Sequence, residues 1–294
     1  MKIKIIGVDY SSAPNKNKPI IVAVGYINLK SFKYNNDKNY VAELTNFISI
    51  NSLENFDVFL NANDNWVGGF DLPFSMPRKL IEKYKWPKAW EKFVQFYCSS
   101  DKVYLRDCFK TWCDSREIGN KFAWRKTDIV SGSSPAMRWT NPPVAWMMHS
   151  GLMRMIRANL YFPSHSYPLT SEKTYSKIFK KSNFTPVKIA LETYPAFRVR
   201  KVTKKSYKSD DRRKHNTDRL ELRKNILSSL TSKTKVQKLK LDITKEMTDI
   251  IISDGKGDYL DAVICMLQAG ESVLKTNFGL SDCIDSLEGW IIIS

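Results

Sequence analysis

Alternating and continuous apolar stretches along the chain predict a series of β-strands. Residues 2–9 alternate and then become apolar, and Pro19–Leu29 is a long run rich in β-branched residues, so both segments predict strands. The segment 40–50 fits either a strand or a helix. Further strands are predicted to end at Asp71 and at Glu192, and the terminal "EGWIII" is typical of a last strand.

Segments with helical spacing lie between these strands. Ser52 is a suitable N-cap for a short helix over "LENFDVFLNAN", and a second helix is predicted over Arg78–Tyr97. Pro143 is expected near the first turn of a third helix, and a basic helix is predicted over Asp210–Leu230. A strongly apolar helix, "GDYLDAVICMLQAGESVL", follows near the C-terminus. Strands that alternate with helices predict an α/β protein.

An aromatic block interrupts the strand series. Six of the eight tryptophans lie at positions 86–146, among Gly, Ser and Pro. We interpret residues 101–168 as an insertion or lid within a single domain that spans residues 1–294. A chain of 294 residues is long enough to bury a full core.

Composition restricts the class of protein and the kind of metal. No apolar run is long enough to cross a bilayer, and Gly7 and Asp9 interrupt the apolar region that a signal peptide needs, so we expect a cytoplasmic protein without a membrane partner. The five cysteines form no CxxC pair, and the three histidines lie far apart. A disulfide framework or a zinc site is therefore not expected, and any metal would be a hard ion with oxygen ligands.

The positive charge is concentrated in one quarter of the chain. Residues 173–245 hold 22 of the 47 Lys and Arg but only 6 of the 30 Asp and Glu, which accounts for +16 of the net charge of +17. Binding to a phosphate backbone requires such a local excess, whereas a solvated lysine-rich surface would also produce it. We favour the first interpretation because the rest of the chain is nearly neutral.

Acidic residues recur where strands end or a helix begins. Asp9, Asp71 and Glu192 each end a predicted strand, and Asp258 and Asp261 open the last long helix on the same helical face. Functional groups of α/β sheets collect beyond the carboxyl ends of the strands, so these acids are expected to meet. Several adjacent carboxylates would repel one another unless a divalent cation compensated their charge. Mg²⁺ or Mn²⁺ is the natural choice, and two such ions can promote hydrolysis of a phosphodiester.

Each acid also has a purely structural explanation. Asp9 and Asp71 could each cap a turn, and Glu192 could pair with a nearby lysine or arginine. Asp258 could be a helix N-cap, with Asp261 favoured in the first turn by the helix dipole. One shared cluster is simpler than four independent coincidences.

These islands of sequence resemble a known family. "IGVDYSSAP", "GGFDLPFSMPR", "LETYPA", "GDYLDAVICMLQA" and "EGWIII", in this order, are similar to the predicted nucleases of the ribonuclease H-like superfamily, and to the family labelled domain of unknown function 429 in particular. The resemblance implies a mixed sheet flanked by helices, with the first three strands antiparallel. It also implies a site that cleaves phosphodiesters with two Mg²⁺ or Mn²⁺ ions.

The resemblance also implies roles for individual acids. Asp9 matches the first-strand Asp that bridges both metals in the superfamily, and Asp71 matches the acid at the end of the fourth strand. Asp258 and Asp261 resemble the paired acids that open the last helix of RuvC-type resolvases. Glu192 matches the "E-x-Y-P" motif of the family and is included as a catalytic residue, but not as a metal ligand. No organic cofactor is expected.

Basic and aromatic side chains complete the expected site. Trp112, Trp124 and Trp139 could stack on bases, and Ser11 and Ser12 could line the site or only complete the turn. For each tryptophan taken singly, we favour ordinary core packing over this role. The cations expected to contact nucleic acid, whether DNA or RNA, are Lys201, Lys204, Lys205, Arg212, Arg213, Lys214, Arg125 and Lys126.

The sequence therefore predicts a metal-dependent nuclease. An actin-like or sugar-kinase-like phosphotransferase is an alternative, because "DYSS" resembles the phosphate-binding turn of that fold. Such proteins usually duplicate the sheet and carry further glycine-rich loops, for which "DGKGD" is the one candidate. A second alternative is a nucleic-acid-binding protein of the same fold without catalysis, although all the acids are intact.

Overall fold

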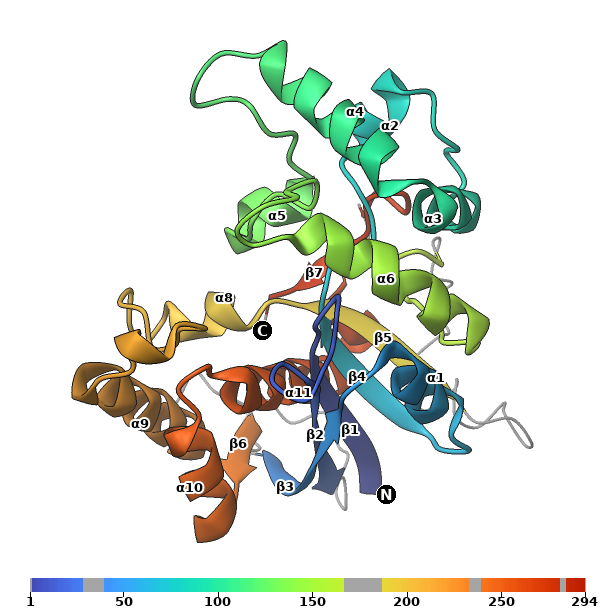
Figure 1. Cartoon of the computed structure of the whole chain (residues 1–294). Helices are drawn as coiled ribbons and strands as arrows, with labels where there is room; N and C mark the ends of the chain where they lie inside the picture. Colours follow the sequence, from blue (N-terminus) through green and yellow to red (C-terminus); the bar gives the residue numbers. More distant parts are fainter. Residues whose placement is uncertain (1, 29–39, 167–186, 233–238, 281–283, 294) are drawn as a thin grey trace.

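The computed structural model describes residues 2–28, 40–166, 187–232, 239–280 and 284–293. Within these residues a seven-stranded mixed sheet with the order β6-β3-β2-β1-β4-β5-β7 forms the centre of the fold (Figure 1). The strands are β1 (Lys2–Asp9), β2 (Ile20–Asn28), β3 (Tyr40–Ile50), β4 (Trp66–Asp71), β5 (Lys188–Thr193), β6 (Leu239–Asp242) and β7 (Ile291–Ile292).

Strand directions divide the sheet into an antiparallel part and a parallel part. β1, β2 and β3 pair antiparallel in sequence order, whereas β4 pairs parallel with β1, β5 with β4 and β7 with β5. The predicted α/β class and the antiparallel first three strands are confirmed. The ambiguous segment 40–50 is a strand, because it pairs with β2 on one side and with β6 on the other.

Helices cover both faces of the sheet. Alternate residues of β1 enter two separate apolar clusters: Ile6 and Val8 pack with α1, α3 and α6, while Ile3 and Ile5 pack with α9, α10 and α11. The helices are α1 (Leu53–Asn61), α2 (Arg78–Lys83), α3 (Trp90–Ser99), α4 (Lys102–Asp114), α5 (Lys126–Ser131), α6 (Val144–Arg157), α8 (Pro195–Val199), α9 (Thr217–Thr231), α10 (Lys245–Ser253) and α11 (Asp258–Val273), with 3₁₀ turns η1 (Arg212–Lys214) and η2 (Thr276–Gly279).

Several helices differ from the prediction. The helix predicted over 78–97 is split into α2 and α3 because Lys85 adopts a left-handed conformation (φ 53°) just before Trp86-Pro87. The basic helix is shorter than predicted, since α9 begins only after its N-cap, Asn216, whose side chain accepts a hydrogen bond from the Arg219 N–H. Helices α4 and α10 and strand β6 were not predicted. None of the helices among the described residues is long and apolar enough to cross a membrane.

The aromatic block forms part of a helical lobe between β4 and β5. Figure 1 shows α2 to α6 grouped together, with α5 and α6 nearest the sheet. The predicted insertion at 101–168 therefore covers α4 to α6, while α2 and α3 of the same lobe precede it. Residues 167 and 168 lie outside the described residues, as do 173–186 and 233–238 of the basic segment.

Two glycines allow the last long helix to lie directly on the sheet. A Cβ on Gly7 of β1 would lie 2.0 Å from the Ala262 carbonyl oxygen, and one on Gly69 of β4 would lie 2.3 Å from the Cys265 carbonyl oxygen. Any side chain at either position would therefore collide with the backbone of α11. The close contact brings the first turn of α11 beside the carboxyl ends of β1 and β4, where two of the predicted acids lie.

Candidate carboxylate site

The first two acids are neighbours across the centre of the sheet. Asp9 and Asp71 are direct partners in the parallel register of β1 and β4. Side chains of adjacent parallel strands at the same register point to the same face, and here that face carries α11. Both side chains are half-buried and line a cavity of about 780 Å³ at this edge of the sheet.

The second pair of acids enters the same cavity from the helix. Gly257 adopts a left-handed conformation (φ 77°) just before α11, and its carbonyl oxygen accepts the Asp261 N–H at 2.9 Å. Asp258 and Asp261 follow one turn apart, both are buried, and both line the cavity with Asp9 and Asp71. The acids expected to hold metal are thus brought together from three separate segments.

Burial and mutual repulsion make ionisation of this cluster costly. Burial, with further repulsion from Asp261, raises the pKa of Asp71 to about 7. Burial, with repulsion from Asp254, raises the pKa of Asp258 to about 6. The pKa of Asp9 is raised well above its ordinary value by burial; Lys208 opposes this shift, and the carboxylates of Asp261, Asp258 and Asp71 add to it. The cavity therefore favours a positively charged occupant.

One cation from the protein already lies in the cluster. Lys208, at the wall of the cavity, forms an ion pair with Asp261, whose other oxygen accepts the hydroxyl of Tyr207. Burial alone would lower the pKa of Lys208, but attraction by Asp261 and Asp9 outweighs it and raises the pKa well above its ordinary value. The sequence alone does not predict this role of Lys208, because no local signal distinguishes it from its basic neighbours.

Glu192 lines the same cavity as the other acids but reaches it from the opposite face of the sheet. It pairs in register with Phe70, so its side chain lies on the face of the sheet opposite to Asp9 and Asp71. There its carboxylate accepts two hydrogen bonds from the Arg125 guanidinium, at 2.6 and 2.9 Å, and one from the Phe74 N–H at 3.0 Å. Burial raises the pKa of Glu192, opposed by Arg125. These contacts join β5 to the helical lobe, and the catalytic role of Glu192 stays a prediction.

Arg125 is not on the surface where contact with nucleic acid was expected. Its side chain is 1% exposed and is held between Asp128 and Glu192, with Nη2 at 2.7 and 2.6 Å from their oxygens. An arginine so enclosed is a bridge within the fold, and the expected contact of Arg125 with nucleic acid is wrong. The neighbouring Lys126 is exposed, and its backbone N–H donates a hydrogen bond to the carboxylate of Glu288.

The other expected cations lie on both sides, in sequence, of a segment that lines the cavity. Residues Ser206 to Asp210 line it, and exposed basic side chains flank this stretch on both sides. Among the tryptophans, Trp124 is 41% exposed, whereas Trp112 is buried and Trp139 packs against Phe109 and Phe122. The exposed cations are Lys201, Lys204, Lys205, Arg212, Arg213 and Lys214.

The donor atoms suit a divalent ion, but they are not arranged as a metal site. Within the described parts of the chain, no three His, Cys, Asp or Glu side chains are placed so that they could hold a metal ion together. Both oxygens of Asp261 are engaged by Tyr207 and Lys208. The residues fit Mg²⁺ or Mn²⁺ in donor chemistry and in their excess of negative charge, and a divalent ion bound to Asp261 would lie beside the positive charge of Lys208.

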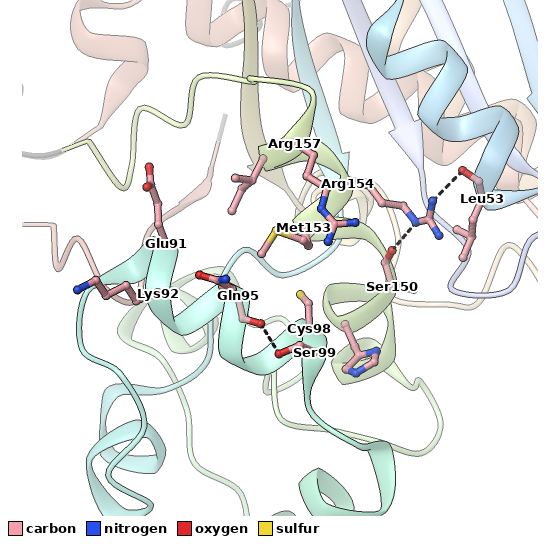
Figure 2. Close-up of a pocket in the computed structure, with 12 residues that line it drawn as sticks. Leu53, Glu91, Lys92, Gln95, Cys98, Ser99, Ser150, Met153, Arg154 and Arg157 are labelled. Carbon is pink, nitrogen blue, oxygen red and sulfur yellow. Dashed lines mark hydrogen bonds between the residues drawn. The ribbon is translucent and has the colours of Figure 1, made fainter.

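A second cavity, of about 680 Å³, lies between α3 and α6 (Figure 2). Arg154 on its wall donates to the carbonyl oxygens of Ser150 and Leu53 and pairs with Asp57. The thiol of Cys98 also lines this cavity, and burial raises its pKa to about 12, so the reactive thiolate is scarce at neutral pH. The carboxylate cavity is therefore the stronger candidate for chemistry.

Comparisons with known proteins add no assignment. Models of protein families, curated proteins and solved structures were each compared with the chain, and none matched. The function is therefore inferred from the geometry and electrostatics of the site itself.

Proposed function

We propose that this protein is a Mg²⁺- or Mn²⁺-dependent nuclease of the ribonuclease H-like type. The observation that carries the proposal is the convergence of Asp9, Asp71, Asp258 and Asp261 on one cavity. Raised pKa values at three of these acids support the need for added positive charge.

The topology supports the same proposal. Strands β3, β2, β1, β4 and β5 are adjacent in this order, with the first three antiparallel and the others parallel to β1. The acids lie at the carboxyl ends of the two central strands and at the start of the helix that packs across them. This is the arrangement that the resemblance to ribonuclease H-like nucleases implies.

Phosphodiester hydrolysis is the chemistry that such a donor set supports best. Held by Asp9, Asp71, Asp258 and Asp261, two divalent ions would activate a water molecule and stabilise the leaving oxygen. Asp9 is central in the sheet and can face both Asp71 and the helix acids. Glu192 and Arg125 hold the helical lobe against β5 and so shape one wall of the cavity.

The basic wall of the cavity supports a polyanionic substrate. The exposed lysines and arginines of residues 201–214 flank the segment that enters the cavity, so a phosphate backbone lying along them would pass the acids. Trp124 is the exposed tryptophan best suited to stack on a base. A strand that contacts these groups would be positioned beside the carboxylates.

Cleavage assays with a matched variant test the proposal. The protein is incubated in Mg²⁺ and in Mn²⁺ with labelled single-stranded, duplex and branched DNA and with RNA. We expect cleavage of at least one substrate by the wild type and by Asp107→Asn, which changes an exposed acid on α4, and none by Asp9→Asn. Cleavage by Asp9→Asn at the wild-type rate would overturn the assignment, and binding without cleavage would favour a non-catalytic role.

A further inference from the structure

Lys208 is a cation of the protein that lines the acidic cavity and pairs with one of its acids. Its ammonium group pairs with Asp261, and its side chain lines the cavity together with Asp9, Asp71 and Asp258. One positive charge thus serves several carboxylates. This is the electrostatic role that a divalent ion would have in the same cavity.

Both oxygens of Asp261 already accept a hydrogen bond. Tyr207 donates its hydroxyl to Oδ1, Lys208 donates to Oδ2, and the side chain is 1% exposed. Each oxygen keeps a second lone pair, but a divalent ion bound to Asp261 would lie beside the Lys208 ammonium, and repulsion between the two positive charges favours the departure of a partner.

The surroundings of the two residues indicate which partner can leave. Tyr207 is buried, and its carbonyl oxygen accepts a hydrogen bond from Arg223 Nη1 at 2.8 Å. Two residues later, the backbone N–H of Ser209 donates to the carbonyl oxygen of Gly255 at 3.0 Å. The backbone here is therefore fixed. The side chain of Lys208 is 40% exposed and extends over Gly257, so its flexible stem can rotate toward solvent without moving the backbone.

We propose that Lys208 is a built-in counterion that occupies the position of a divalent ion and must rotate out of the cavity before metal binds. Rotation breaks its ion pair with Asp261 and frees Oδ2 as a ligand, while Tyr207 continues to orient the carboxylate through Oδ1. The inference rests on the proposed metal site, and it adds that metal affinity is limited by competition with this lysine.

Binding of Mn²⁺ in the absence of substrate tests the competition. Free Mn²⁺ is measured by electron paramagnetic resonance during titration of the wild type, Lys208→Met and Lys204→Met, the last being a control with the same loss of charge at an exposed position of the same segment. We expect Lys208→Met to bind Mn²⁺ about tenfold more tightly than wild type, or better, which corresponds to roughly 1.4 kcal/mol. The Kd of Lys204→Met should change less than about twofold, because its ammonium is exposed to solvent and screened.

The outcomes separate the inference from the proposed function. If the wild type binds Mn²⁺ and Lys208→Met binds it no more tightly, competition by Lys208 is refuted while the metal site stands. If none of the three proteins binds Mn²⁺, the proposed nuclease and the inference both fail.

A second measurement uses only the wild type and so does not depend on the folding of a variant. Reductive methylation followed by mass spectrometry reports the accessibility of each lysine amine. Lys208 should react slowly in chelator and several times faster in Mn²⁺, whereas Lys204 should react equally in both. Equal rates for Lys208 in the two conditions would contradict its displacement.

Discussion

Replacing Asp71 by asparagine should stabilise the metal-free protein, although the substitution removes a residue of the proposed active site. Asparagine has the shape of the protonated acid but carries no charge. Because the pKa of Asp71 is raised to about 7, the folded protein binds its proton more tightly than the unfolded chain does. The stability contributed by the protonated acid is therefore present at low pH and is lost as the pH rises from about 4 through 7.

The size of the effect follows from the two pKa values. The pKa of this acid has an ordinary value of 3.8 in the unfolded chain. The raised pKa in the folded protein therefore lowers the free energy of unfolding by about 4 kcal/mol at pH 8 and by about 1 kcal/mol at pH 4.5. The advantage of Asp71→Asn over wild type should therefore grow by about 3 kcal/mol between these two pH values. Lys208 keeps its partner Asp261 in the variant, so it does not become unpaired.

Urea unfolding of both proteins in chelator, at several pH values between 4.5 and 8, measures this difference. Groups that titrate identically in the two proteins cancel in the comparison. Excess Mn²⁺ should reduce the difference in unfolding free energy between the two proteins at pH 8, because Mn²⁺ binds the folded wild type more tightly than the folded variant. A difference in unfolding free energy that stays constant with pH, or that falls toward pH 8, would show that Asp71 does not lie in a repulsive carboxylate cluster.

Three further predictions concern the fold and the basic wall. Gly7→Ala should destabilise the protein by about 3 kcal/mol or more in urea unfolding, because its Cβ would meet the backbone of α11, and a smaller loss would refute that contact. Glu192→Gln should cost about 3–5 kcal/mol in the same assay by leaving Arg125 partly unpaired, whereas unchanged stability with lost cleavage would make Glu192 catalytic. Replacing Arg212 and Lys214 together by glutamine should reduce the slope of log affinity for nucleic acid against log salt by about 2, and an unchanged slope would exclude phosphate contact.

Local patterns were sufficient to predict the central part of the fold and the meeting of four acids. Alternating and then continuous apolar residues identified β1, and the apolar run after Asp258 identified α11. The convergence of Asp9, Asp71 and the helix acids follows from one general rule, that parallel strands end at the same edge of a sheet. Short elements such as β6 have too few residues to show a pattern, and β6 is a strand because it pairs with β3.

The features of the site that the sequence does not predict have a common physical cause, since each depends on a partner distant in sequence. Glu192 ends a strand as Asp71 does, but its register partner is Phe70, so it faces the other side of the sheet. Arg125 lies in a polar stretch and is buried because it meets Glu192 across the fold. Lys208 resembles its basic neighbours and is distinguished only by its contact with Asp261.

The most direct test of the central claim is a crystal structure of the protein with Mn²⁺, in which anomalous scattering locates the ions. The account predicts Mn²⁺ in the cavity, bound by oxygens of Asp9, Asp71 and the helix acids Asp258 and Asp261, with the ammonium of Lys208 turned away from Asp261. A cavity without Mn²⁺ at saturating concentration, with Lys208 still paired to Asp261, would contradict it.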